Sequence, residues 1–122
     1  MEYVRKVDFA KLNASDKRFT QVMLDGDSGG TKCSINCIKT PAGEGSPAGM
    51  HVHEVDQVFY VLSGVMSLAI EAKEYTAGPG TLVFFPAGVP HRNWNAGSEA
   101  TVHLAINVPL PDPAKPFATT VG

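Results

Sequence analysis

The sequence predicts an all-β domain, and three observations support this. Nine prolines and twelve glycines interrupt the 122 residues, and these residue types are typical of the turns between short strands. Apolar residues recur with the two-residue period of strands, whereas the 3.6-residue period of a helix is almost absent. About eight or nine short strands follow from this pattern. Such chains close into a barrel or a two-sheet jelly roll, which limits exposed strand edges.

The first half of the chain alternates expected strands with turns. In order, the expected elements are an edge strand over 3–9, one helical turn within 10–17, strands over 19–24 and 32–39, and a long strand over 50–62 that can bend. A glycine-rich break at 26–30 and a loop rich in Gly and Pro at 41–49 separate the later strands.

The second half continues in the same way. Strands are expected over 65–70, 81–85, 91–95 and 100–108, with a polar hairpin tip at 71–74. The tail, residues 109–122, contains four prolines. Because proline cannot donate a backbone hydrogen bond, this tail cannot be a central strand. We expect it to wrap a sheet edge or to reach a partner subunit.

Length and charge limit the function classes. The chain is long enough for one buried core, and it shows neither repeats nor a linker, so residues 1–122 are expected to form a single domain. Twelve acidic and ten basic side chains are scattered, which argues against nucleic acid or a membrane surface as a partner. No apolar run approaches the ~20 residues of a membrane span. The start of the chain lacks the apolar stretch of a signal peptide, so we expect a cytoplasmic protein.

The two cysteines are expected to remain free. Cys33 and Cys37 lie on one expected strand, where four residues span ~13 Å. A disulfide requires Cα atoms within about 7 Å. We interpret both as small buried apolar residues rather than as metal or redox groups.

Two expected strands are apolar on both faces. They contain the runs Val58 to Leu62 and Leu82 to Phe85. A strand in a two-sheet structure needs only one buried face, so the outer face is predicted to meet a second copy in a homodimer.

Three of the four histidines suggest a metal site. His51 and His53 are two residues apart, and side chains at this spacing point to the same face of a strand. His91 follows a Pro-Ala-Gly turn forty residues later and could complete three ligands from a neighbouring strand.

Two segments resemble the conserved motifs of the cupin superfamily. The segment 45–64, GSPAGMHVHEVDQVFYVLSG, resembles the first motif, with Gly, His-x-His and a closing Gly at the family spacing. The segment 80–95, GTLVFFPAGVPHRNWN, is similar to the second motif, with Gly, Pro-x-Gly, His and Asn. The resemblance implies a small single-domain, usually dimeric barrel of the double-stranded β-helix type. It also implies one divalent metal ion in the barrel mouth, bound by His51, His53 and His91.

Gln57 departs from the family pattern, which usually has Glu at this position. Glu54 and Asp56 do not replace it, because alternation places them on the opposite face from His53 and Gln57. The Gln57 amide either binds the metal through its oxygen or hydrogen-bonds a bound water. Four neutral ligands leave the charge of the ion uncompensated, so the site should favour an anionic ligand and bind metal more weakly than a site with Glu.

The ligand types limit the choice of metal, and the strand pattern suggests which residues line the pocket. Imidazole suits Fe, Zn, Ni and Cu, and the missing carboxylate makes Mn a poorer choice. Phe59 and Val61 share the ligand face and are expected to line a substrate pocket. His103, on the strand after the second motif, either lines this cavity as a proton shuttle or is a surface residue.

These observations favour a metal-dependent enzyme. The substrate would be a small enol, phenol or keto acid, and dioxygenase chemistry on iron is the first hypothesis. Isomerase or cyclase chemistry is a close rival. The alternative from another class is a non-catalytic barrel that binds metal or a small molecule.

Overall fold

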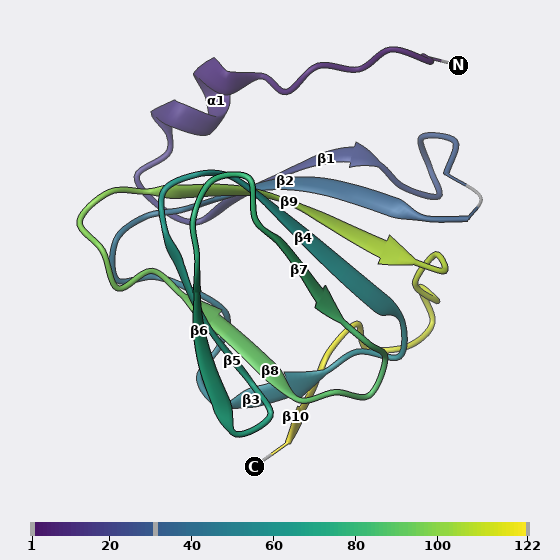
Figure 1. Cartoon of the computed structure of the whole chain (residues 1–122). Helices are drawn as coiled ribbons and strands as arrows, with labels where there is room; N and C mark the ends of the chain where they lie inside the picture. Colours follow the sequence, from purple (N-terminus) through teal and green to yellow (C-terminus); the bar gives the residue numbers. More distant parts are fainter. Residues whose placement is uncertain (1, 31, 122) are drawn as a thin grey trace.

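The computed structural model describes residues 2–30 and 32–121 and contains two five-stranded antiparallel sheets that pack face to face (Figure 1). The first sheet has the order β1 (Phe19–Leu24), β2 (Ser34–Thr40), β9 (Thr101–Val108), β4 (Asp56–Ser63) and β7 (Leu82–Phe85). The second has the order β10 (Thr119–Val121), β3 (Met50–Val52), β8 (His91–Trp94), β5 (Met66–Ile70) and β6 (Lys73–Ala77). This arrangement is the all-β double-stranded β-helix, or jelly roll, that the sequence predicts.

The core lies between the sheets because strand alternation sends every second side chain inward. Phe59 and Val61 of β4 point inward and are buried, whereas Tyr60 between them is 40% exposed. Met66 and Leu68 of β5 meet them from the other sheet. Between β4 and β5, Gly64 adopts a φ of 76°, and a Cβ there would lie 2.5 Å from the carbonyl oxygen of Ala100. This turn therefore requires glycine, which adopts a positive φ without steric cost.

One short helix, α1 (Phe9–Ala14), covers the outer side of β1 and β2 (Figure 1). Asp8 caps it, since its side chain accepts a hydrogen bond from the backbone N–H of Lys11 at 3.1 Å. Leu12 is fully buried against Cys37. The helical turn was predicted, but the edge strand over 3–9 was wrong. This segment lies outside the sheets, and its Arg5 side chain donates instead to the Met23 carbonyl at 2.9 Å.

The predicted strand over 50–62 is two strands that belong to different sheets. The chain leaves one sheet after β3 and enters the other at β4, so residues 53–55 form the crossing (Figure 1). The Gly88 N–H donates to the His53 carbonyl at 2.9 Å and holds this crossing against the turn before β8. Strand β6 was missed because four of its five residues are exposed, which leaves no apolar alternation to detect.

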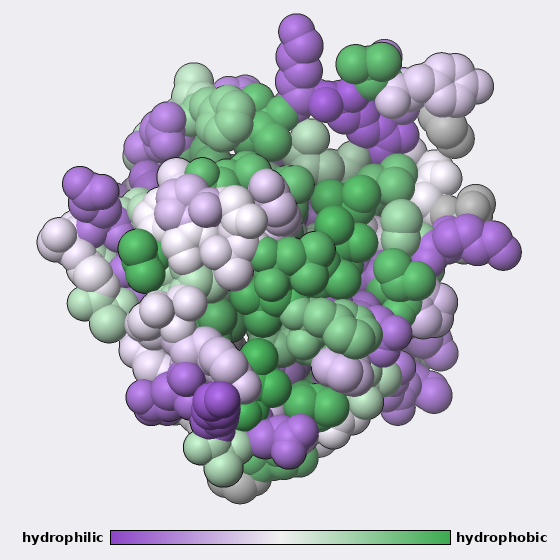
Figure 2. Space-filling view, viewed as in Figure 1, coloured by the Kyte–Doolittle hydropathy of each residue, from purple (hydrophilic) through white to green (hydrophobic). Residues whose placement is uncertain are grey.

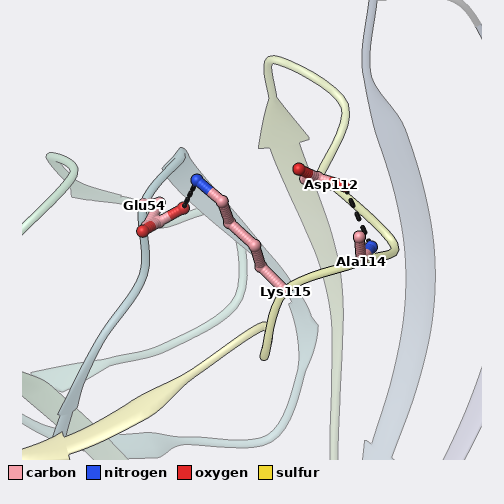
Figure 3. A network of polar contacts seen from close by, with 4 residues as sticks. All are labelled: Glu54, Asp112, Ala114 and Lys115. Carbon is pink, nitrogen blue, oxygen red and sulfur yellow. Dashed lines mark hydrogen bonds and ion pairs between the residues drawn. The ribbon is translucent and has the colours of Figure 1, made fainter.

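The C-terminal tail follows a sheet edge, one of the two expected alternatives. After β9 the chain turns back, and β10 pairs with β3 (Figure 1). One ion pair joins the tail to the crossing segment, and one hydrogen bond forms a turn within the tail (Figure 3). The ammonium group of Lys115 lies 3.5 Å from the Glu54 carboxylate, and the Asp112 carboxylate accepts from the Ala114 N–H at 2.9 Å.

The outer face of the first sheet is apolar. Figure 2 shows a hydrophobic area across the middle of this view, over β9, β4 and β7. Its exposed members include Tyr60, Leu82, Phe84 and Val108. A homodimer formed through this face stays a prediction. In the part of the chain that the structure describes, no helix is long and apolar enough to cross a membrane.

The two cysteines are free, as predicted. Cys37 is buried in β2 beneath α1, whereas Cys33 is half-buried and precedes the strand.

Candidate metal centre

Three histidines meet at one end of the barrel. His51 of β3 lies directly opposite His91 of β8 in the register of the second sheet, and His53 follows β3 at the crossing. The potential ligand atoms of the three side chains lie within 4.8 Å of one another. Imidazole nitrogens gathered this closely could hold one metal ion together. The convergence predicted from the sequence spacing is present.

Backbone carbonyls orient two of these rings. His53 Nδ1 lies 2.9 Å from the Phe117 carbonyl oxygen, and His91 Nδ1 lies 3.0 Å from the Val89 carbonyl oxygen. A carbonyl oxygen can only accept, so each Nδ1 carries the proton and each Nε2 keeps a lone pair. This arrangement is typical of metal-ligating histidines. His91 Nε2 is buried without a hydrogen-bond partner among the described residues. A metal ion bound to its lone pair would supply the missing partner.

Burial keeps these imidazoles neutral. It lowers the pKa of His51 to about 4, with further contributions from the neighbouring His91 and His53 rings and from Arg18. Burial also lowers the pKa of His53 and of His91, although the carbonyl contacts oppose it. Neutral imidazole is the form that binds metal, so a cation competes little with protons at neutral pH. The chemistry of the three residues thus fits a divalent transition metal.

Gln57 is fixed by a buried chain of hydrogen bonds. It lies opposite Asn107 in the β4–β9 pair, and its Nε2 donates to Asn107 Oδ1 at 3.0 Å. Asn107 Nδ2 in turn donates to Ser34 Oγ at 3.0 Å. Because Nε2 is engaged by Asn107, Oε1 is the atom that remains for a cation or its water. The Gln57 side chain also contacts His53 and raises the pKa of that ring.

A cavity of about 380 Å³ opens beside the cluster, in the size range of small-molecule sites, and of the three histidines His51 and His53 line it whereas His91 does not. Its apolar wall includes Ile38, Phe59, Ala105 and Phe117. Its polar lining includes Arg18, Thr20, Asn36, Ser46, His51, His53, Gln57, Asn93, Asn107 and Thr120. Phe59 therefore lines the cavity as expected. Arg18 and Asn93 are lining residues that the sequence analysis did not select.

The structure places Val61 and His103 in the core rather than in this lining, which corrects their expected role. His103 lies opposite Ile38 and Val61 in the first sheet, and its ring centroid is 4.3 Å from that of Phe59. Its side chain is fully buried, and neither ring nitrogen has a partner among the described residues. Burial first, and then the charge of Arg18, lowers the pKa of His103 to about 3.

The comparisons with known proteins agree with this geometry. The model of the Cupin domain family matches residues 38–107, more than half of the chain. The chain belongs to the cupin family. A comparison with curated proteins finds no match.

Solved structures of other cupins and enzymes share the fold. An RmlC-like cupin from Methanocaldococcus jannaschii is 20% identical, with 91% of this chain and 94% of that chain covered and a TM-score of 0.73. The polyketide cyclase RemF from Streptomyces resistomycificus is 20% identical, with 100% and 86% covered and a TM-score of 0.76. A putative sugar phosphate isomerase from Acidithiobacillus ferrooxidans is 32% identical, with 76% of this cupin and 60% of that chain covered and a TM-score of 0.66.

Replacing Gln57 with Glu should tighten metal binding by about tenfold or more. The substitution adds one negative charge beside the site, and two opposite unit charges 4 Å apart attract by ~4 kcal/mol at an effective dielectric constant of ~20. Isothermal titration of the metal-free protein with Zn²⁺ or Ni²⁺ measures this change. Asn13→Asp, exposed on α1, alters the net charge equally and should leave the affinity unchanged. Equal affinities for all three proteins would show that residue 57 does not contact the ion or its water.

Proposed function

We propose that this cupin is a metal-dependent enzyme acting on a small enol, phenol or keto acid. The observation that carries the proposal is the set of three neutral imidazoles, two of them with oriented Nε2 lone pairs, beside a cavity of small-molecule size. A divalent Fe, Zn, Ni or Cu ion, with Mn a poorer choice, would supply Lewis acidity toward a substrate oxygen, and iron would add redox chemistry with dioxygen. His51, His53 and His91 would hold it, with Gln57 as the fourth group.

The cavity favours dioxygenase chemistry as the first form of this proposal. In the described part of the chain, no carboxylate lines the cavity. Isomerisation and cyclisation move protons and depend on a positioned general acid or base. A substrate that binds as a preformed enolate needs no such base, and its oxidation by dioxygen would need the redox chemistry of a bound iron ion and a protein wall that orients the substrate. The apolar wall with Phe59 and Phe117 would position the substrate and exclude water.

Isomerase or cyclase chemistry is the second candidate. The similarity to a putative sugar phosphate isomerase at 32% identity and to the polyketide cyclase RemF in fold supports it. A non-catalytic barrel that binds metal or a small molecule is the alternative outside enzymes.

One experiment separates these functions. The untagged protein is stripped of metal, reloaded with Fe²⁺, Zn²⁺ or Ni²⁺, and mixed with pentane-2,4-dione, catechol or 2,4-dioxopentanoate. We expect dioxygen uptake only with iron, reduced by more than about a hundredfold in His91→Ala because one ligand is lost. Substrate deuteration in D₂O without dioxygen uptake would instead identify isomerase or cyclase chemistry. Ligand binding without either reaction would identify the non-catalytic barrel and refute the proposed enzyme.

A further inference from the structure

Arg18 projects into the cavity because of its position in the strand pattern. It directly precedes β1, and residues 18 and 20 share one face of that strand. Both Arg18 and Thr20 line the cavity, whereas Phe19 between them packs on the opposite side with Leu12 of α1. The guanidinium group therefore lines the same cavity as His51 and His53.

Among the described residues, no carboxylate forms a contact ion pair with this guanidinium, although burial lowers the pKa of Arg18 and the charge of Glu44 raises it. No carboxylate oxygen of the described chain lies within 4.0 Å of the guanidinium, and no acceptor in that part receives a hydrogen bond from its nitrogens. The nearby Glu44 carboxylate accepts at 3.0 Å from the backbone N–H of Arg18 rather than from the side chain. The Nε atom is buried, and no described residue accepts a hydrogen bond from it. Arginine stays protonated in proteins, so the cavity wall carries a permanent positive charge.

A second unpaired donor faces the same cavity. Asn93 of β8, two residues after His91, is only 3% exposed and lines the cavity. Its Nδ2 atom is buried with no acceptor among the described residues. Its backbone carbonyl, in contrast, is occupied by the Ser46 N–H at 2.9 Å. A buried donor without a partner costs about 1–3 kcal/mol, and an oxygen-rich ligand would remove this cost.

We propose that the ligand of this site is a small organic acid whose carboxylate pairs with Arg18, while a second oxygen function faces the histidines and Asn93. The flat fork of the guanidinium matches a carboxylate through two parallel hydrogen bonds. With no acidic side chain in the lining, both Arg18 and a bound divalent ion would draw an anion into the cavity. The inference rests on the proposed function and narrows its substrate class to keto acids, with Arg18 as the residue that selects them over neutral diketones and phenols.

Two probes that differ by one carboxylate test this role. 2,4-Dioxopentanoate and pentane-2,4-dione share the diketone group, and only the first carries a carboxylate. Titrations of the Zn²⁺-loaded protein should show the acid binding about ten- to a hundredfold more tightly than the diketone. Arg18→Gln should remove this preference, because it should weaken binding of the acid far more than binding of the diketone. Arg18→Lys should keep part of it, since the charge remains but the fork is lost.

Metal affinity provides a separate readout. Arg18→Gln removes a positive charge near His51, so Zn²⁺ should bind with equal or higher affinity, and thermal unfolding should confirm the fold. If the wild type binds metal but does not prefer the acid over the diketone, the inference is overturned. It is also overturned if Arg18→Gln prefers the acid as strongly as the wild type does. Failure of the wild type to bind metal would instead refute the proposed function. In that case binding of the acid is measured with the metal-free protein. The role of Arg18 in binding the carboxylate is then supported only if Arg18→Gln weakens binding of the acid.

Discussion

Replacing His53 with alanine should abolish stoichiometric metal binding and leave a folded barrel. The His53 ring is held from two sides by the chain segment at Phe117, whose carbonyl lies 2.9 Å from Nδ1 and whose ring stacks on it at 4.2 Å. Loss of even an outer partner of a ligand typically weakens metal binding by about 10- to 100-fold, so loss of the ligand should cost at least that. Elemental analysis after gel filtration measures the metal content, and circular dichroism reports the fold.

The matched control removes a histidine outside the cluster. His103→Leu lowers the histidine count equally, but His103 lies in the core and does not line the cavity. This variant should keep one metal ion per chain. Full metal occupancy in a folded His53→Ala protein would refute the ligand assignment, and metal loss in both variants would show that the effect is not specific to the cluster.

The ligand set could be predicted because it depends on local spacing. The two-residue separation of His51 and His53 places them on one side of the chain under strand alternation, and their meeting with His91 follows from the family spacing of two motifs. Gln57 was predicted to share this side, and the structure places it in the cavity lining. Side chains continue to alternate between inward and outward positions through residues 53–55, although these residues are not part of a strand. The inward side of β3 therefore continues as the inward side of β4.

The division of residues 50–62 into two strands and the structure of the N-terminal segment could not be predicted, because they depend on which distant segments pair with them. The pattern from Met50 to Leu62 is the same for one long strand and for two strands in different sheets, and only the pairing with β8 and β9 separates them. The N-terminal segment has strand-like residues, but it pairs with no strand among the described residues, and the Asp8 side chain caps helix α1 directly after it.

The positions of the Arg18 and His103 side chains could not be predicted from the sequence for a similar reason. The strand FTQVML has comparable apolar content on its two faces, so its sequence does not show that Arg18 faces inward. Only the packing of Phe19 beneath α1 decides this. His103 points inward as the strand pattern allows, but it lies four residues from Asn107 along β9, about 13 Å at 3.3 Å per residue. That distance separates it from the end of the barrel where Gln57 pairs with Asn107.

The buried His103 should make the metal-free protein sensitive to acid. Its pKa is about 3 in the folded chain and 6.5 in the reference state. Above pH 6.5 neither state binds the proton, and stability is not reduced. As the pH falls from 6.5 towards 3, the unfolded chain takes up a proton that the folded chain rejects, so the free energy of unfolding decreases by up to about 1.4 kcal/mol per pH unit. His51, with a pKa lowered to about 4, acts in the same direction.

His103→Leu should reduce the pH dependence of the free energy of unfolding, because one proton fewer is taken up on unfolding. At pH 7.5 the variant should be as stable as the wild type or about 1–3 kcal/mol more stable, because two unpartnered buried nitrogens are replaced by a side chain of similar volume. The gain should grow as the pH is lowered to 5. Urea unfolding with chelator present, followed by the fluorescence of the single tryptophan, measures both effects. A variant that is destabilised at pH 7.5 and keeps the wild-type pH slope would mean that the His103 nitrogens are paired, and that the acid sensitivity arises from the metal-site histidines alone.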